Sequence, residues 1–437
     1  MIQKSMDAQK RKTLCFLLCM LCTFCTDLHM MVYMNNVAKL QPYTSPIQTV
    51  AALTFLALAI RRPMSKTAKW HLGLGIALVG WAVIAKYFHG LFGEPREYLG
   101  VFVQRFLVLL PFGALMQDEK SCQGLKGAGV LTLGVCGYLC FWALLLFLNL
   151  VPGAMQECVY WSGARMNPLW NPIIFAVIMF TGIALCVAGC FLARKLWQRA
   201  ALLAFAVVQF LFISMTHSRT VVLVLCAFVA GTAFFALGQG SIQKRIAWAL
   251  VGIAAAAALF GLSEAVYNAN NQHLIGQLEA SGAEFHINDQ GYITDGVTNQ
   301  GSLKEDMGSL NGRTETWKIV LDAVKNNREL RIFGTSQFRK NIREDMAHSH
   351  NSWLEMLVYL GIPGLLLSLI LTAEILIALA RVFLFCRNKA QLVLALFVLC
   401  MLPIGIMEPF LFCTVHLGDL FILTGGYLWA WGTRETA

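Results

Sequence analysis

Residues 200–238 read AALLAFAVVQFLFISMTHSRTVVLVLCAFVAGTAFFALG, and this stretch indicates the class of fold. As one helix it would be roughly 58 Å long at about 1.5 Å per residue, nearly twice the hydrocarbon thickness of a bilayer, which is about 30 Å. Its polar break is Thr216-His217-Ser218-Arg219. The stretch is therefore predicted to form two membrane helices joined by a tight turn that contains Arg219.

The composition of the whole chain agrees with a membrane protein. Of the 437 residues, 57% are apolar and 13% are charged. A soluble domain has about 45–50% apolar and about 25% charged residues, so a soluble enzyme and a disordered chain are excluded. The net charge of +10 would suggest nucleic acid in a soluble protein. In a membrane protein, basic residues are first expected in cytoplasmic loops, so no nucleic acid partner is expected.

Apolar segments long enough to span a bilayer recur along the chain. They predict an all-α integral membrane protein with about twelve transmembrane helices. The predicted spans are 13–34, 44–60, 70–88, 99–116, 126–150, 172–193, 200–216, 221–238, 246–265, 353–380, 390–408 and 411–431. The chain then divides into nine helices in residues 1–265, a large loop in 266–352 and three helices in 353–437.

The basic residues predict the orientation. With a cytoplasmic N-terminus, 19 of the 34 Lys and Arg residues lie on the inner side and nine lie in the loop 266–352. Long loops translocate largely regardless of charge, so the comparison rests on the short connections, which divide 19 to 6. Both termini are thus predicted to be cytoplasmic, and the loop 266–352 to be extracytoplasmic.

The loop 266–352 has two different halves. The first is rich in Asn, Gln and Gly. The second places Trp317, Val320, Leu321 and Val324 at i, i+3, i+4 and i+7, which predicts an amphipathic helix that begins next to Arg313. Its apolar stripe is expected either on the membrane surface or against the outer ends of the membrane helices.

Three residues of the predicted outer face could share one chemistry. They are Arg219 in the tight turn, Arg313 at the start of the loop helix and His350 just before the tenth span. Arginine binds phosphate through a planar charged fork, and histidine exchanges protons near neutral pH. Alternatively, an arginine at a helix end anchors the helix by snorkelling, and an interfacial histidine is a plain surface residue or helix cap.

Further residues are expected to support such a site. Arg105, near the outer end of the fourth span, either helps to hold phosphate or snorkels. Glu408 beside Pro409 could orient an arginine or contact a sugar. His348 and Asn351 flank His350 and complete the set of supporting residues.

Three motifs resemble one known family. The segment His350-Asn351-Ser352-Trp353-Leu354-Glu355, followed by Gly361 and Gly364, is similar to the histidine motif of bacterial O-antigen ligases and Wzy-type polymerases. The stretch Ser218-Arg219-Thr220-Val221-Val222-Leu223 resembles the Ser-Arg turn of that family, and Gly312-Arg313-Thr314-Glu315-Thr316-Trp317 resembles its arginine-bearing loop helix. The resemblance covers roughly residues 160–410.

The resemblance implies a glycosyltransferase in the bacterial cytoplasmic membrane, with its active site on the extracytoplasmic face. The donor would be a glycan on undecaprenyl diphosphate. The acceptor would be a sugar hydroxyl on another lipid-linked repeat or on a lipid A core. His350 would act as the general base, and Arg219 and Arg313 would bind the diphosphate. Arg105 lies outside the resemblance and is added as a third candidate for the diphosphate from its place in the fourth span. Membrane lipids would be the other partners.

No metal or other cofactor is expected for this chemistry. Arginines can serve a polyprenyl diphosphate donor, and the predicted outer face shows no compact Asp/Glu/His set. His348 lies two residues before His350, but neither a Cys nor a further spaced His accompanies the pair.

Alternative functions stay open. Twelve spans with inner termini also fit a secondary transporter or a lipid-oligosaccharide flippase, although the two halves of the chain show no visible repeat. A sensor or assembly protein without catalysis is a third possibility. Ligase and polymerase are not separated by the sequence, because both use the same donor.

Overall fold

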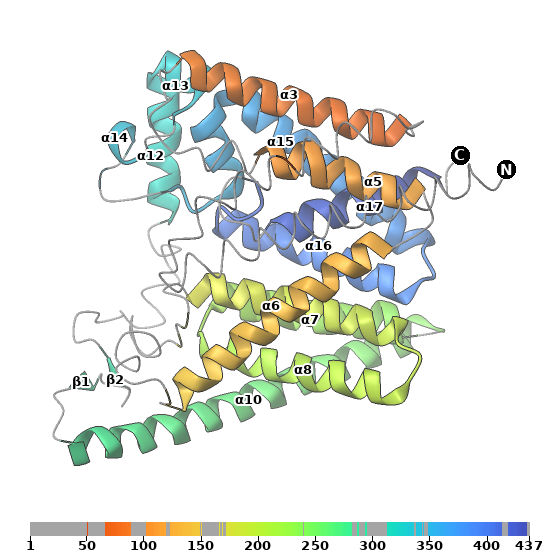
Figure 1. Cartoon of the computed structure of the whole chain (residues 1–437), viewed down its shortest axis with the longest axis vertical. Coiled ribbons are helices and arrows are strands. Elements are labelled where there is room, and N and C mark those ends of the chain that lie inside the picture. Colours follow the sequence, from red (N-terminus) through yellow and green to blue (C-terminus); the bar gives the residue numbers. More distant parts are fainter. Residues whose placement is uncertain are drawn as a thin grey trace. The chain divides into compact units, whose positions relative to one another are not determined.

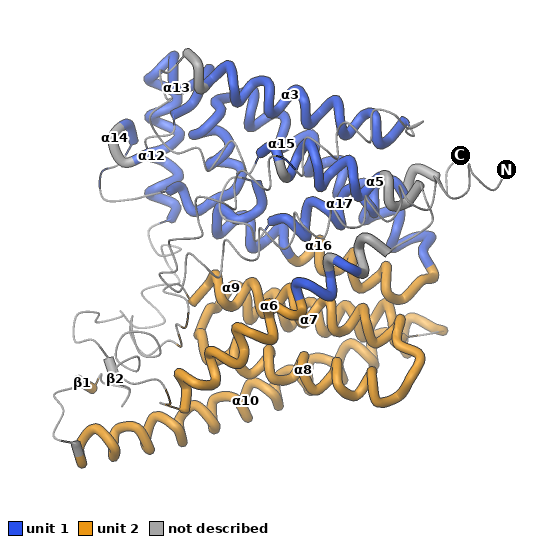
Figure 2. The backbone as a smooth tube through the Cα atoms, viewed as in Figure 1, with its two compact units in different colours: residues 1–132, 309–386, 401–437 blue, residues 133–308, 387–400 orange. Residues whose placement is uncertain are grey.

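The computed structural model groups the chain into two compact units, shown in blue and orange in Figure 2. Unit 1 contains residues 1–132, 309–386 and 401–437, and unit 2 contains residues 133–308 and 387–400. The structure describes residues 50, 66–88, 102–118, 123–148, 150, 166, 168, 172–238, 240–281, 286–287, 293–294, 313–335, 338–342, 344, 348–412 and 418–434. The division of the sequence at residues 265 and 352 remains a prediction.

Unit 1 is helical in its described part (Figure 1). Its elements are α3 (Lys66–Phe88), the π-helix η2 (Val103–Leu109), α5 (Leu110–Asp118), α12 (Arg313–Asn326), α13 (Arg328–Phe333), α14 (Phe338–Asn341), α15 (Ser352–Phe385) and α17 (Asp419–Arg434).

Unit 2 adds a second group of helices and one short strand pair. Its elements are α7 (Pro172–Leu192), α8 (Leu196–Met215), α9 (Arg219–Thr232), the π-helix η4 (Ala233–Leu237), α10 (Ile242–Ser281), and the antiparallel strands β1 (His286–Ile287) and β2 (Ile293–Thr294). The helices α6 (Gln123–Phe147) and α16 (Lys389–Met407) each have residues in both units.

The helices support an integral membrane protein. Within the described ranges, eight are long and apolar enough to cross a membrane, namely α3, α6, α7, α8, α9 continued by η4, α10, α15 and α16. The predicted spans 13–34 and 44–60 lie outside the described residues, apart from Val50. The predicted span 411–431 begins later than expected, because α17 begins at Asp419. The number of twelve spans and the side of the termini remain predictions.

The predicted turn in the stretch 200–238 is confirmed. Helix α8 ends at Met215 and α9 begins at Arg219. Thr216 closes the end of α8 through its hydroxyl, which donates to the carbonyl of Ile213 at 2.6 Å. His217 has φ +50°, a conformation that reverses the chain within three residues.

Helix α10 is longer than the predicted span 246–265. Its 40 residues correspond to about 60 Å, twice the hydrocarbon thickness. The helix continues to Ser281, so the first residues of the predicted loop 266–352 are helical. Tyr267, Asn271, Leu274 and Leu278 are buried at helical spacing. The polar composition of residues 266–281 predicted a loop. The segment is helical because one of its faces is buried against the rest of the protein.

Helix α15 is broken at Gly361, where the sequence predicted one continuous span from residue 353. Gly361 has φ +66°, and Pro363 follows. On the N-terminal side of the break, two main-chain carbonyls accept hydrogen bonds from residues outside the helix. Val358 O accepts from the N–H of Thr335 at 2.5 Å, and Leu360 O accepts from Trp81 Nε1 at 2.8 Å. The nine residues before Gly361 therefore form a separate short helix.

The amphipathic loop helix packs against this short helix. Val320 of α12 packs with Phe338 and Val358, and Val324 packs with Leu330 and Leu357. Of the two places expected for the apolar stripe, the structure thus favours the ends of the bundle. Leu321 was wrongly included in the stripe. It is 50% exposed, because the buried face runs along i and i+4 positions.

We expect Gly361→Ala to loosen this contact. A Cβ on Gly361 would lie 2.2 Å from the carbonyl oxygen of Ile332, and the positive φ alone costs an L-residue about 1–2 kcal/mol. The thermal midpoint Tm of the purified protein should fall. Gly80→Ala in α3 is the matched control, because a Cβ at Gly80 meets nothing within 4 Å. An equal Tm for both variants would contradict the prediction.

Candidate active site

The candidate site lies in unit 1, where three chain segments meet. Arg313 is the first residue of α12, His350 lies two residues before α15, and Glu408 follows the end of α16. In the sequence, Arg313 lies 95 positions and His350 lies 58 positions before Glu408. Their proximity is therefore a product of tertiary packing.

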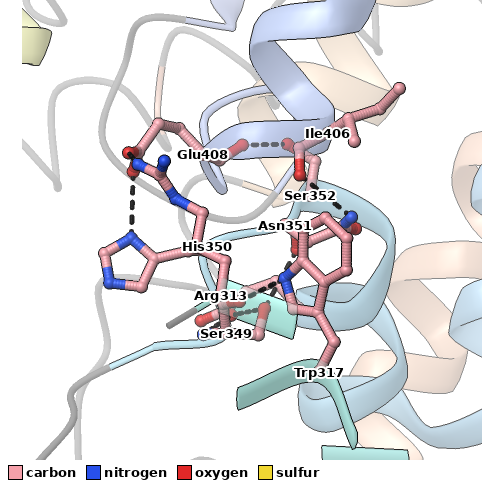
Figure 3. A network of polar contacts seen from close by, with 9 residues as sticks. Arg313, Trp317, Ser349, His350, Asn351, Ser352, Ile406 and Glu408 are labelled. Carbon is pink, nitrogen blue, oxygen red and sulfur yellow. Dashed lines mark hydrogen bonds and ion pairs between the residues drawn. The ribbon is translucent and has the colours of Figure 1, made fainter. Parts of the chain in front are cut away.

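Glu408 joins the arginine and the histidine (Figure 3). Its Oε1 accepts from the Arg313 guanidinium Nη2 at 2.5 Å, and its Oε2 lies 3.3 Å from His350 Nδ1. The side chain of Glu408 is 5% exposed, that of Arg313 15% and that of His350 29%. The carboxylate is thus almost buried between two donors, and the histidine is the most accessible of the three.

The start of α15 holds Glu408 in place. Asn351 caps α15 by accepting from the N–H groups of Trp353 and Leu354, and its amide donates to the carbonyl of Ile406 in α16 at 3.1 Å. The Ser352 hydroxyl donates to the main-chain carbonyl of Glu408 at 2.8 Å. The residues next to His350 in the sequence therefore bind the segment that carries Glu408.

His350 is itself held in a strained conformation. Its φ is +54°, a region in which non-glycine residues are uncommon. Ser349 fixes the chain before it: its N–H and hydroxyl both donate to Glu355 Oε2, at 2.8 and 2.5 Å. Trp317 Nε1 donates to the carbonyl of Ser349 at 3.1 Å and so joins α12 to this turn. Strained residues of this kind persist only where the surroundings hold them.

His348 lies against His350. The two ring centroids are 4.2 Å apart in an edge-on arrangement. Burial lowers the pKa of His348 to about 4; the neighbouring His350 and the Arg313 guanidinium act in the same direction, and Glu408 opposes them. His348 is therefore neutral at neutral pH, and it adds no charge to the site.

The geometry around Glu408 defines what His350 can do. With Glu408 ionised, the nearby Nδ1 carries a proton, and Nε2 then has its lone pair available in the neutral ring. A carboxylate that orients a histidine in this way prepares it to accept a proton from a hydroxyl group. Of the two roles expected for Glu408, the geometry favours orientation over sugar contact, because both carboxylate oxygens face side chains of the protein.

Arg105 does not reach an open surface. Its side chain is 0% exposed, and its Nε donates to Asp419 Oδ1 at 2.7 Å. The pair joins η2 to the first residue of α17. This arrangement favours a structural role for Arg105 over the predicted contact with a diphosphate.

Arg219 lies in unit 2. It is exposed at the first position of α9, directly after the turn 216–218. The sequence predicted that Arg219, Arg313 and His350 share one site. The structure brings Arg313 and His350 together in unit 1, and the participation of Arg219 stays a prediction.

Metal-ligating residues do not gather in the described ranges. No group of three or more His, Cys, Asp and Glu residues with suitable positions occurs there. His348 and His350 have Glu408 nearby, but one oxygen of Glu408 is bonded to Arg313.

Residues 204–369 match the family model of O-antigen ligases. This part of the chain is therefore similar to O-antigen ligases. The resemblance inferred from the three motifs is confirmed over these residues, and the match contains Arg219, Arg313 and His350. No curated protein sequence matches the chain.

Two supporting residues of the candidate site are not evident from the sequence alone. Ser352 was read only as part of the histidine motif, and Ser349 was not singled out. In the structure Ser352 holds the main chain of Glu408, and Ser349 holds the turn before His350. The capping-box pattern places the glutamate three residues after the serine, so the six-residue separation of Ser349 and Glu355 gave no local signal for the second contact.

The low pKa of His348 predicts a pH effect on stability. Between about pH 4 and pH 6.5 the folded state binds fewer protons at His348 than the unfolded chain does, so the stability decreases as the pH falls through this window. We expect the Tm to fall more between pH 7 and pH 5 in the native protein than in His348→Gln. His273→Gln, which changes an exposed histidine of α10, should behave like the native protein. An equal fall in the native protein and His348→Gln would contradict the prediction.

Proposed function

We propose that the chain is a membrane glycosyltransferase of the O-antigen ligase or polymerase type. It transfers a glycan from undecaprenyl diphosphate to a sugar hydroxyl, on the extracytoplasmic side of the bacterial cytoplasmic membrane. The observation that carries the proposal is the contact of His350 Nδ1 with Glu408, beside Arg313, in a chain whose residues 204–369 are similar to O-antigen ligases.

His350 acts as the general base in this proposal. A sugar hydroxyl is a weak nucleophile until its proton is removed. Nε2 of His350 takes that proton while Nδ1 stays bonded to Glu408, which stabilises the imidazolium that forms. The acceptor oxygen then bonds to C1 of the donor glycan as the bond from C1 to the diphosphate oxygen breaks. Direct displacement inverts the anomeric centre without a covalent sugar intermediate.

The arginines stabilise the leaving group. Negative charge grows on undecaprenyl diphosphate as it departs with the electron pair, and fixed cationic donors at that position lower the barrier. Arg313 is held by Glu408 through one nitrogen, so its remaining N–H groups are the donors that would face the diphosphate. Arg219 supplies the second guanidinium in the proposal, and Arg105 is left to hold Asp419.

The acceptor remains of two kinds. A hydroxyl on a second lipid-linked repeat makes the protein a polymerase, and a hydroxyl on a lipid A core makes it a ligase. The same base and the same leaving group serve both. No metal ion has a step in this mechanism.

Release of undecaprenyl diphosphate tests the proposed activity. The purified full chain, given an undecaprenyl-diphosphate-linked glycan and a saccharide acceptor without ATP, should release undecaprenyl diphosphate and form the longer glycan. Both products are measured by mass spectrometry. If reconstituted protein moves the lipid-linked glycan across vesicles and forms no new glycosidic bond, the protein is a flippase and the proposal is wrong.

Removal of the base or the cations should reduce transfer. We expect His350→Ala to lower kcat by about 10²- to 10⁴-fold, the usual contribution of a general base. Arg219→Ala should abolish measurable transfer, and Arg313→Lys should weaken it because a point charge does not replace a planar fork. His273→Ala and Arg331→Lys, which change exposed residues, serve as controls. Full activity in His350→Ala would show that the base is another residue.

Glu408→Gln tests the orientation of His350. An amide offers one oxygen, so either Arg313 or Nδ1 of His350 loses its acceptor. We expect kcat to fall about tenfold or more, since a wrongly oriented or wrongly protonated histidine is a poor base. Glu344→Gln removes a similar charge from an exposed position and should leave kcat unchanged. Native kcat in Glu408→Gln would contradict a positioning role for this carboxylate.

A further inference from the structure

A second histidine with a carboxylate partner lies in unit 2. His217 Nε2 is 3.4 Å from Glu264 Oε1, and each side chain is a little under one-third exposed. The His217 ring also meets the ring of Tyr267 edge-on, with centroids 5.5 Å apart. Glu264 and Tyr267 are three residues apart on α10, so they lie on one face of that helix. His217 thus connects the turn between α8 and α9 to α10.

The conformation of this turn depends on its neighbours. His217 has φ +50°, and the surrounding bonds hold it there: its N–H donates to Ser214 O at 3.0 Å, and the N–H of Ser218 donates to Thr216 Oγ1 at 3.3 Å. Strained backbone of this kind is typical of functional sites. A contact between a histidine and a carboxylate that are both partly exposed contributes little to stability by itself.

The consequence of the turn is the placement of Arg219. Arg219 begins α9 two residues after His217, and the direction of α9 follows from the reversal of the chain at His217. Helix α8 is fixed independently to α10 by Ser263 Oγ, which donates to Leu211 O at 2.9 Å. The contact of His217 with Glu264 is thus a second link to α10, made by the turn that immediately precedes Arg219.

We propose that the His217–Glu264 pair, together with Tyr267, is a positioning device that sets Arg219 for the diphosphate of the donor. The inference rests on the proposed function, because Arg219 is assigned to the donor there. His217 and Glu264 act through Arg219 and are positioning residues. They take no part in proton transfer from the acceptor, which belongs to His350.

Two variants separate the pair from the backbone strain. Glu264→Gln keeps the size of the side chain and removes its charge. His217→Asn keeps a residue type that adopts positive φ readily and removes the ring. We expect both to raise the donor KM about tenfold and to lower kcat as well, while the acceptor KM stays near its native value, because Arg219 is assigned both to the bound diphosphate and to the charge that grows on it in the transition state. The affinity for added undecaprenyl diphosphate should fall by the same factor.

The matched controls lie on the same helix. Glu279→Gln removes an exposed carboxylate from α10, and His273→Asn removes an exposed ring. Neither should change the donor KM or the binding of undecaprenyl diphosphate. If the substitutions weakened α10 in general, the donor KM would rise in the controls as much as in the test variants. That result would overturn the proposal.

A double-mutant comparison shows whether the pair acts through Arg219. An Arg219→Lys variant retains a cation and measurable binding of undecaprenyl diphosphate. In the Arg219→Lys background, Glu264→Gln should weaken the binding of undecaprenyl diphosphate by less than a further twofold. If the two residues acted independently, the full effect of Glu264→Gln would appear in this background as well. If Glu264→Gln leaves the donor KM unchanged while Arg219→Ala loses transfer, the inference is wrong and the proposed function stands. If Arg219→Ala keeps full transfer, the proposed role of Arg219 fails first, and the positioning role fails with it.

Discussion

The arrangement of the candidate site depends on one almost buried carboxylate. Removing an ion from water is costly, and Glu408 is stabilised only because Arg313 and His350 both approach it. The three residues come from separate segments, so the contact also fixes the ends of α12, α15 and α16 relative to one another. The same carboxylate contacts Nδ1 of His350, so the packing of these segments and the orientation of the histidine depend on one residue.

Rigid support surrounds that contact. The short helix 352–360 is separated from the rest of α15 by Gly361 and is covered by α12 and α13. Gly334, at the end of α13, lies against the backbone of Tyr359. A Cβ on Gly334 would be 2.4 Å from that backbone, so only glycine lets the two segments approach this closely. Helices α12 and α13 thus pack on the short helix that begins beside His350 and support the backbone next to this residue.

The two units contribute different parts of the proposed chemistry. Unit 1 contains a histidine oriented by a carboxylate and one arginine, a set suited to proton removal next to a developing anion. Unit 2 contains Arg219 after a strained turn that is fixed to α10. Both parts belong to residues 204–369, which match the O-antigen ligase family, whereas Glu408 comes from outside the match.

The sequence by itself determined the features that depend on local pattern. Hydropathy and helix length predicted the membrane helices and the turn at 216–219, and periodicity together with the family motif predicted a helix that begins at Arg313. Only the tertiary structure decided that Glu408 bonds Arg313 and His350, that Leu321 is exposed, that α15 breaks at Gly361 and that α10 continues to Ser281. Each of these depends on which distant segment packs against the residue, and a local pattern of apolar and polar side chains does not specify that neighbour.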